Sequence, residues 1–293
     1  MSRLLTLWIL TGMGCSKDTA GGTSQAGPTT GTRGFIEYLP GSLPLIIAVP
    51  HGGYEEPDDL SWLPGGRQGR DENSLEAALD LVFEIEELTG EVPHLILNHL
   101  HADILNAAAS QEDGAGEHPD TQAAWEEFHA FIRTSKTEVI STWGSGHYID
   151  FQANEHDEGW AEVGVGLTAA ALSGEADAIR ASCTDTTVAH LCTTGADLLE
   201  LTQGATSLGG LLSTEGHLVV PSPDQPTPGD GNFSSSNWNT WEHGSHLGGR
   251  IDATVLDSHQ SMLTEDKRAQ YARDLAETII SFLNIHYGAD LPS

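Results

Sequence analysis

Polar residues that could hold a metal ion or carry protons follow several strand-like stretches of this sequence. The first is His51, which comes directly after an apolar run, Leu45–Val49, and a proline. A run of this length with β-branched residues predicts a buried strand, usually of a parallel sheet, and chemistry in open α/β sheets collects just past the carboxyl ends of such strands. The glycines at 52 and 53 let the backbone turn sharply and leave the imidazole accessible. His51 is therefore the first candidate ligand or catalytic group, although a polar residue that merely ends a strand has the same pattern.

Further polar groups follow two later strand-like stretches. One group extends from Asp150 to His156, and Asp257 follows residues 251–256. Asp71 closes the loop after His51, where it suits either a metal ligand or the N-cap of the next helix. A hydrolytic zinc site needs about three nitrogen or oxygen ligands, an open position for water and a base that takes the proton of the water. These residues supply groups of each kind.

The elements that would position these residues alternate between strands and helices. We expect amphipathic helices after Asp71, after Pro119 and from Thr264, with shorter ones at Ala176–Ala181 and Leu198–Gln203. Residues 221–249 are rich in Pro, Gly, Ser and Asn, which is typical of a functional or mobile loop. The expected strands are Leu45–Val49, His94–Asn98, 148–151, 218–220 and 251–256. Strands that alternate with helices predict an α/β fold with a mostly parallel sheet.

The composition excludes several classes of partner. The 293 residues include 43 Asp and Glu against 12 Lys and Arg, a formal net charge of -31. Phosphate binding needs clustered Lys and Arg, so we expect no nucleic-acid partner and no attraction to anionic membrane surfaces. Small polyanionic substrates are disfavoured for the same reason, unless a local cation or metal reverses the field. The hydrophobic content of 38% favours a globular chain with an ample core.

The amino-terminal residues favour export. Residues 1–14 have the charged start and short apolar run of a secretory signal peptide. Gly12-Met13-Gly14-Cys15 resembles a bacterial lipobox, in which Cys15 is lipidated and becomes the new amino terminus. We expect residues 15–33 to be a flexible tether and residues 34–293 to be a single domain. This predicts an extracytoplasmic bacterial lipoprotein that meets the membrane only through its lipid anchor. The alternatives are an ordinary signal peptide cut elsewhere and an unusual cytoplasmic start.

Two cysteines remain in the predicted domain, Cys183 and Cys192. Oxidising conditions outside the cytoplasm favour a disulfide between them, and two unpaired buried thiols are the alternative. The sequence has no CxxC motif, so neither a zinc ribbon nor a thioredoxin-like motif is expected.

Several ordered motifs together resemble the N-formylglutamate amidohydrolase family, relatives of the zinc carboxypeptidases. They cover most of the chain after the expected tether: Val49-Pro50-His51-Gly52-Gly53, Asp71-Glu72-Asn73-Ser74, Tyr148-Ile149-Asp150, Glu242-His243-Gly244-Ser245, and Gly249-Arg250-Ile251-Asp252 through to Asp257. The resemblance implies a three-layer α/β fold of the phosphorylase/hydrolase type, in which helices cover both faces of a mostly parallel sheet. The implied activity is metal-dependent amide hydrolysis.

The resemblance assigns the site residue by residue. His51 and Asp71 match the first two metal ligands. The third ligand, a histidine two residues after the strand aspartate, falls on Gln152, and glutamine is a poor zinc ligand beside imidazole. A later alternate position keeps its imidazole as His156, which becomes the candidate third ligand. The general base of the family, a glutamate, falls on Asp257, whose shorter side chain can displace the carboxylate by roughly an ångström.

The segment 99–107 departs from the family where substrate would bind. Leu100, Ala102 and Ala107 stand where the resemblance implies basic groups for a substrate carboxylate or an oxyanion. We therefore expect a small neutral or cationic amide or peptide-like substrate, and not dianionic formylglutamate. Asn239 and His243 are candidate substrate contacts, or hydrogen-bonding groups that order their loop. The alternative function is a catalytically degenerate surface lipoprotein that keeps the fold for binding or scaffolding.

Overall fold

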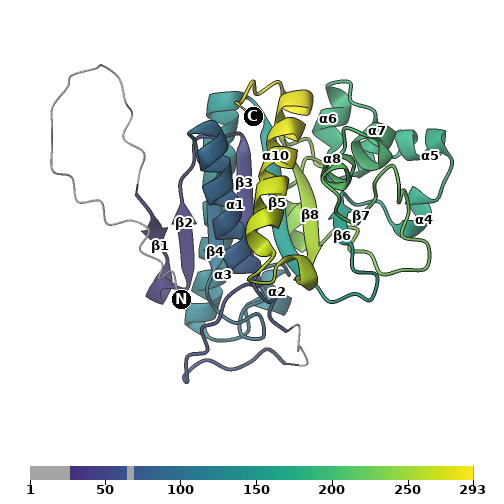
Figure 1. Ribbon diagram of the computed structural model, residues 1–293. Helices are drawn as coiled ribbons and strands as arrows, with labels where there is room; N and C mark the ends of the chain where they lie inside the picture. The colour runs from purple at the N-terminus through teal and green to yellow at the C-terminus, as the bar shows by residue number, and fades with distance from the viewer. Residues whose placement is uncertain (1–26, 65–68, 293) are drawn as a thin grey trace, which may run out of the picture.

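The computed structural model describes residues 27–64 and 69–292 (Figure 1). The expected signal peptide (1–14), the lipidation site Cys15 and most of the expected tether lie outside the described residues. Regular structure begins before residue 34, because β1 (Thr29–Thr30) pairs with β2 (Ile36–Leu39) across the short helix η1 (Thr32–Gly34). The last residues of the expected tether therefore belong to the edge of the sheet. No helix in the described ranges has both the length and the apolar composition needed to cross a membrane.

One sheet runs through the described residues, and its eight strands lie in the order β1-β2-β4-β3-β5-β8-β6-β7. The strands after β2 are β3 (Leu45–Val49), β4 (His94–Asn98), β5 (Gly146–Asn154), β6 (Ala161–Gly164), β7 (Val219–Val220) and β8 (Ile251–His259). The central strands β4, β3, β5 and β8 are parallel, whereas β2 and β6 run antiparallel to their neighbours β4 and β8. The prediction of an α/β fold with a mostly parallel sheet is confirmed.

Alternate residues of β3 enter two separate hydrophobic cores, which makes the fold three-layered. Leu45, Ile47 and Val49 pack on one face with α1 (Ser74–Thr89) and α10 (Arg268–Tyr287). Ile46 and Ala48 pack on the other face with α3 (Pro119–Trp143). Figure 1 shows α1 and α10 side by side over the sheet. Because both faces are covered, β3 is apolar throughout, as a central parallel strand requires.

The strands that carry the candidate residues are longer than the sequence indicates. β5 and β8 pair along their whole length, from Gly146↔Ile251 to Asn154↔His259. Asp150 and Asp257 therefore lie inside strands, whereas the sequence pattern placed them at strand ends. The hydrogen bonds of the ladder satisfy the backbone of these polar residues, so the strands continue past their apolar segments.

The expected loop 221–249 contains a short helix, α9 (Trp238–His243). Asn237 caps α9, because its side chain accepts from the backbone N–H of Thr240 while the Thr240 side chain bonds back to Asn237. This capping box satisfies donors that a helix start would otherwise leave free. The other short helices preceding α9 are α2 (Gln111–Gly114), α4 (Ala169–Leu172), α5 (Ala176–Ala181), α6 (Ala189–Thr193), α7 (Leu198–Gln203) and α8 (Leu208–Thr214).

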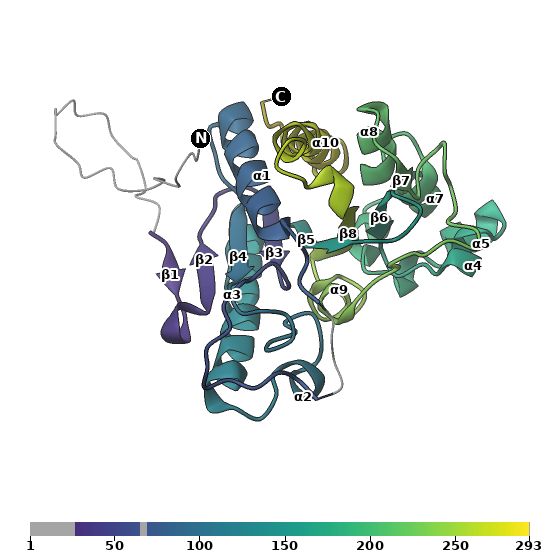
Figure 2. The same cartoon turned by 60° about the horizontal axis from the view of Figure 1, so that its bottom comes forward.

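Helices α4 to α8 gather around β6 and β7, at one end of the sheet (Figures 1 and 2). A disulfide joins Cys183 to Cys192 within this group, so the expected pairing is confirmed. It connects η2 (Cys183–Asp185) to α6. The bridge closes a short loop among helices of four to seven residues, which are too short to be stable by themselves.

Candidate metal and acid–base site

The turn that follows β3 brings His51 and Asp71 together. The backbone N–H of Asp71 donates to the carbonyl oxygen of His51 at 3.2 Å, which ties the two chain segments to each other. Gly53 makes this turn possible, because a Cβ at that position would collide with the backbone of residues 99 and 100. The His51 Nδ1 atom then lies 3.6 Å from the Asp71 Oδ2 atom. The sequence expectation that these two residues converge therefore agrees with the geometry.

The other ring nitrogen of His51 is already engaged. Its Nε2 atom lies 2.7 Å from the side-chain oxygen of Asn106, which also accepts from the backbone N–H of Ala108 at 3.0 Å. An oxygen that accepts from Ala108 accepts from His51 as well, so His51 Nε2 carries a proton. Nδ1 is therefore the nitrogen that faces Asp71 and is left for a ligand bond.

Charge around His51 favours its protonated form. The side chain is only 8% exposed. Burial acts to lower the pKa of His51, but Asp71, together with Asn106 and Asp150, outweighs it, and the pKa of this imidazole is raised to about 9. A cation that binds at Nδ1 must displace this proton, and its own charge then takes over the role of the imidazolium beside Asp71.

A second tie places Asp71 at the end of β5. The Asp71 Oδ2 atom accepts from the backbone N–H of Ala153 at 3.0 Å. Asp71 is not the N-cap of α1, because that position belongs to Asn73, and the Ser74 hydroxyl bonds the Asp71 carbonyl oxygen. The carboxylate is thus directed across the sheet edge and away from the helix that follows it.

Neighbouring strands align three polar side chains at this edge. Gln152 of β5 is paired with Asp257 of β8, and Asp257 is paired with Glu162 of β6. Paired residues of adjacent strands project from the same face of a sheet, so the three side chains form a row. The expected base Asp257 therefore lies beside Glu162, a residue that sequence reasoning did not single out.

Asp257 is held by two hydrogen bonds in a nearly dry environment. Its carboxylate accepts from the Ser234 hydroxyl at 2.6 Å and from the Asn154 side-chain amide at 3.2 Å. Burial raises the pKa of Asp257 to about 6, and the charges of Glu162 and Asp71 act in the same direction. A carboxylate with this pKa is ionised at neutral pH and basic enough to take a proton, which suits a general base.

The His156 ring contacts Glu162, and not the His51–Asp71 pair that was expected. Its Nδ1 atom lies 2.6 Å from the Glu162 Oε1 atom, and its backbone N–H donates to Asn154. Because Asn154 in turn bonds Asp257, His156 belongs to the same network as the base. Its side chain is 34% exposed, so the ring keeps an accessible edge.

The side chain of Gln152 is hydrogen-bonded to Asp150 and does not take the place of the third metal ligand. Its side-chain amide donates to Asp150, which is fully buried. Asp150 also accepts from Tyr148, Asn237 and Asn239, and these bonds satisfy its charge without a cation. Gln152 thus serves to complete the hydrogen-bond shell of a buried carboxylate.

The expected substrate contacts Asn239 and His243 lie in the interior. Asn239 is 0% and His243 1% exposed. His243 bonds the buried His129 at 2.9 Å, and its carbonyl oxygen accepts from the Lys136 ammonium group. Burial holds the pKa of His243 well below its usual value, so the ring is neutral. The geometry favours the loop-ordering role over substrate contact for both residues.

The His51–Asp71 pair, but not the full expected ligand set, has the spacing of two ligands of one zinc ion. Two ligands of one zinc ion, each roughly 2.1 Å from it at a tetrahedral angle, lie roughly 3.4 Å apart. The 3.6 Å between His51 Nδ1 and Asp71 Oδ2 is close to that value and is too long for a good hydrogen bond. His156 supplies a further imidazole on the same network, but its Nδ1 atom is directed to Glu162. The structure thus brings together two of the three expected ligands, whereas the ligand atoms of His51, Asp71 and His156 do not all lie within 4.8 Å of one another.

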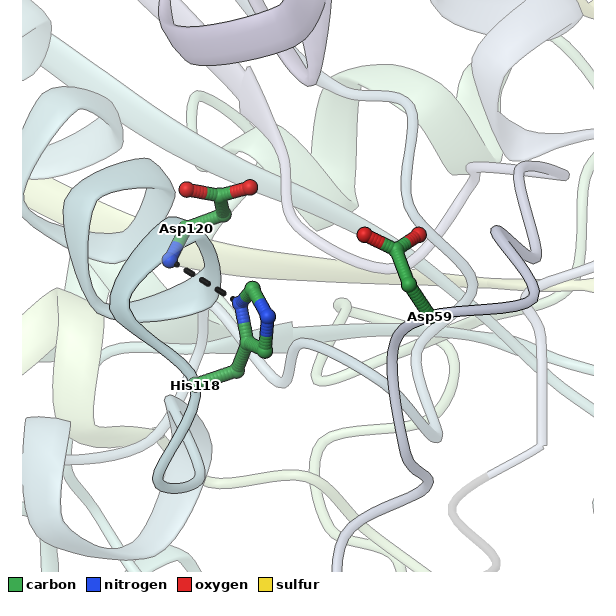
Figure 3. A group of neighbouring side chains, drawn as sticks. All are labelled: Asp59, His118 and Asp120. Carbon is green, nitrogen blue, oxygen red and sulfur yellow. Dashed lines mark hydrogen bonds between the residues drawn. The ribbon is translucent and has the colours of Figure 1, made fainter.

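Within residues 27–64 and 69–292, a different group of three potential ligands does converge. Asp59, His118 and Asp120 have ligand atoms that all lie within 4.8 Å of one another (Figure 3). Arg33 already bridges the two carboxylates, with 2.7 Å to Asp59 and 3.1 Å to Asp120. The His118 Nδ1 atom accepts from the backbone N–H of Asp120, as the N-cap of α3. These contacts explain the group as an ion-pair cluster that fixes η1 against α3.

Fold and site together define a three-layer α/β protein with a histidine–carboxylate pair at the carboxyl edge of its parallel strands. Neither a protein-family model nor a curated protein matches the sequence. Among solved structures, the fold is similar to that of an N-formylglutamate amidohydrolase from Ralstonia eutropha JMP134, with a TM-score of 0.49, 12% identity, and coverage of 84% of this chain and 94% of that chain. It is also similar to a gene product from Agrobacterium tumefaciens, with a TM-score of 0.47, 11% identity, and coverage of 83% and 90%. At these values the likeness concerns the path of the chain and says nothing about chemistry.

Proposed function

We propose that this protein is a zinc-dependent hydrolase of amide bonds. His51 and Asp71 hold the metal, His156 joins them as the third ligand only if its ring turns from Glu162, and Asp257 is the general base. The observation that carries the proposal is the 3.6 Å separation of His51 Nδ1 and Asp71 Oδ2, beside a carboxylate whose pKa is raised to about 6. A ligand pair next to a base of that strength is the combination that metal-assisted hydrolysis requires.

The residues of the chain divide the work of such a reaction. A bound zinc ion supplies Lewis-acid chemistry, which polarises the carbonyl group of the substrate. Asp257 takes the proton of the attacking water and returns it to the leaving nitrogen. Ser234 and Asn154 hold the Asp257 carboxylate in place through the bonds at 2.6 and 3.2 Å. Asn106 fixes the His51 ring so that Nδ1 faces Asp71.

We expect the substrate to be a small neutral or cationic amide or peptide-like molecule. Leu100, Ala102 and Ala107 are apolar and fully buried, so they offer no positive charge to a substrate carboxylate. Asp71, Asp257 and Glu162 give the edge a negative field, which repels anions. We also propose that the protein works outside the cytoplasm as a lipoprotein anchored through Cys15, on the basis of the motif at residues 12–15.

A catalytically degenerate binding or scaffolding lipoprotein is the second candidate. It is favoured by the position of the Gln152 amide, which is committed to Asp150, and by the direction of His156 Nδ1. A cleft of about 450 Å³ lies beside His94 and Trp143, near the start of β4, and not at the His51–Asp71 pair. A binding function at that cleft would leave the candidate site without a role.

Metal binding separates the two candidates. Metal-free protein is titrated with zinc, and binding is measured by calorimetry together with the shift of the melting temperature. We expect one zinc per chain in the wild type and none at this site in His51→Ala. His286→Ala is the matched control, because its ring bonds the Thr206 carbonyl oxygen at 2.8 Å and takes no part in the site. A wild-type chain that binds no zinc and does not melt differently in its presence would favour the degenerate protein.

Amide hydrolysis is then assayed on the zinc-loaded chain. Matched amides that differ only in carrying an ammonium group, a neutral group or a carboxylate test the expected charge preference. We expect turnover of the first two and a loss of turnover in Asp257→Asn without a loss of zinc. Turnover of the carboxylate substrate alone would contradict the proposed substrate class.

A further inference from the structure

A cleft of about 450 Å³ lies at the amino edge of the parallel strands, opposite the edge that carries His51 and Asp71. Its walls are the connection before β3 (residues 41–43), the first residue of β4, His94, and the last turns of α3 from Thr137 to Trp143. Clefts that bind small molecules generally have volumes of roughly 300–1,000 Å³ and a few well-placed polar groups. The size and place of this cleft therefore suit a ligand site that is separate from the candidate metal site.

Hydrogen bonds and close packing hold the walls of the cleft together. The indole N–H of Trp143 donates to the carbonyl oxygen of Ser42 at 2.8 Å, which joins the end of α3 to the connection before β3. The backbone N–H of Ser42 donates to the carbonyl oxygen of Val92 at 2.9 Å. Gly41 lies so close to Pro93 that a Cβ at position 41 would collide with the backbone there. The cleft is therefore formed by segments that are tied to one another, as a preformed site requires.

His94 gives the cleft a hydrogen-bond donor. The residue is 2% exposed, and burial lowers the pKa of His94 to about 4, so the ring is neutral at neutral pH. Its Nδ1 atom accepts from the backbone N–H of Gly41 at 3.1 Å and lies 2.9 Å from the Tyr38 hydroxyl. A backbone N–H can only donate, so Nδ1 carries the lone pair and Nε2 carries the proton. Within the described residues no acceptor bonds this Nε2–H group, which leaves it for an oxygen atom of a ligand.

The acceptors of the cleft include a carboxylate and hydroxyl oxygens. The Glu138 side chain is 52% exposed, and its contact with the Tyr38 hydroxyl is long, at 3.4 Å. The Thr137 hydroxyl donates to a carbonyl oxygen of α3 at 2.9 Å and the Ser42 hydroxyl donates to Glu91, so both oxygens can still accept. Among the described residues that line the cleft, Glu138 is the charged one. The cleft therefore disfavours an anionic ligand.

Trp143 adds a flat apolar surface to these polar groups. The residue is 38% exposed, although a tryptophan ring gains much stability from being covered. Its N–H bond to Ser42 fixes one edge of the indole at the wall of the cleft. A ligand with an apolar face can stack on such a ring while its polar groups reach the hydrogen-bonding partners beside it.

The polar groups of the cleft select among the remaining ligand classes. An ammonium group has donors and no acceptor, so it would leave the Nε2–H of His94 without a partner. Hydroxyl groups both donate and accept, and they can therefore bond His94 and Glu138 at the same time. A sugar ring carries several hydroxyl groups around an apolar face, so it matches the donor, the acceptors and the indole together.

We propose that this cleft binds a neutral sugar ring, which stacks on Trp143 and hydrogen-bonds the side chains of His94 and Glu138. The inference rests on the binding function that is the second candidate above and names its ligand class. It requires no metal, because the cleft and the His51–Asp71 pair lie at opposite ends of β3 and β4.

Saturation-transfer NMR on the full chain tests binding, with glucose, mannose, N-acetylglucosamine and cellobiose as probes. The indole N–H signals report the location, and the Trp143 signal is the one that disappears in Trp143→Ala. We expect at least one probe to bind and to shift the Trp143 signal, and its affinity to fall roughly 10-fold in Trp143→Ala. Trp62→Ala is the matched control, because Trp62 is 46% exposed and stacks on His101, beyond the other end of β4. If no probe binds, or if Trp143→Ala binds it as tightly as the wild type, the inference is overturned.

The charge of the probe distinguishes a sugar site from a cation site. The neutral probe that binds most tightly is compared with glucuronate and with tetramethylammonium, on the wild type and on Glu138→Gln. We expect glucuronate to bind more weakly than the neutral probe, and the difference to narrow in Glu138→Gln because a repelling charge is removed. Tighter binding of tetramethylammonium than of every neutral probe would overturn the inference and indicate a cation–π site. The zinc titration described above decides between the two candidate functions independently of these results.

Discussion

Replacing Asp257 with asparagine is expected to stabilise the metal-free protein at neutral pH. The Asp257 carboxylate is 6% exposed, and its neighbours Glu162 and Asp71 carry the same charge. Its pKa is raised from 3.8 to about 6, so the folded state holds a proton on Asp257 in a range where the unfolded chain has released it. Stability therefore falls as the pH rises through this window, because the folded state must ionise a group that burial and like charges disfavour.

The size of the effect follows from the displacement of the pKa. A difference of about two units corresponds to about 3 kcal/mol between the fully protonated and the fully ionised limits. About 1.4 kcal/mol of this loss of stability falls between about pH 5 and about pH 8. The rest falls at lower pH, because Asp257 of the unfolded chain is already mostly ionised at about pH 5. Asparagine does not titrate, and the Ser234 hydroxyl can still bond its side chain. The difference in unfolding free energy between variant and wild type should therefore grow with pH.

Urea unfolding in the presence of a chelator measures this difference at several pH values. We expect Asp257→Asn to gain stability over the wild type by about 1.4 kcal/mol between about pH 5 and about pH 8. Asp230→Asn, on an exposed loop, controls for the change in net charge and should show no such trend. A difference between Asp257→Asn and the wild type that stays constant over this range would refute the argument that Asp257 is ionised against its surroundings.

Three further predictions concern the framework around the site. Gly53→Ala should lower the unfolding free energy by about 1–3 kcal/mol, because the added Cβ meets the backbone of residues 99 and 100. Zinc affinity should fall as well, which competition with a chelating dye measures. A variant that is as stable as the wild type in denaturant titration would contradict the close approach. Cys183→Ser should lower the unfolding free energy by about 2–3 kcal/mol, because a short cross-link is lost. Equal stability of variant and wild type under oxidising conditions would contradict this prediction. Phe128→Ala should lower stability by about 3–5 kcal/mol, since this fully buried ring packs between α3 and the sheet; a loss below about 1 kcal/mol would indicate a core that collapses around the cavity.

Where helices cover both faces of the sheet, the sequence pattern was sufficient to locate the elements. β3 is apolar at every position because each of its residues faces one of two cores, and the predicted span Leu45–Val49 is the span observed. The span of β4 was also predicted correctly, for the same reason. His51 could be selected from the sequence because it follows such a strand directly and precedes the glycines that turn the chain.

The pattern failed where strands carry polar residues or are very short. β5 and β8 extend through Asp150, Gln152 and Asp257, because their polar side chains find partners across the sheet and the backbone ladder continues. β6 has four residues, one of them Glu162, so neither alternation nor an apolar run marks it. Glu162 and Ser234 were missed for that reason: each acquires its role only from a partner that is distant in sequence.

The distribution of charge at the carboxyl edge leaves one carboxylate, Asp257, without a cationic partner. His51 Nδ1 lies 3.6 Å from Asp71, and His156 Nδ1 lies 2.6 Å from Glu162, so each of these carboxylates has an imidazole partner. Asp257 is next to both carboxylates and has only neutral donors, Ser234 and Asn154, so its charge is left unbalanced. A divalent ion at His51 and Asp71 would add positive charge close to Asp257 and lower the pKa of this base. We therefore expect zinc to weaken the pH dependence of the stability difference between Asp257→Asn and the wild type, and an identical dependence with and without zinc would place the metal away from Asp257.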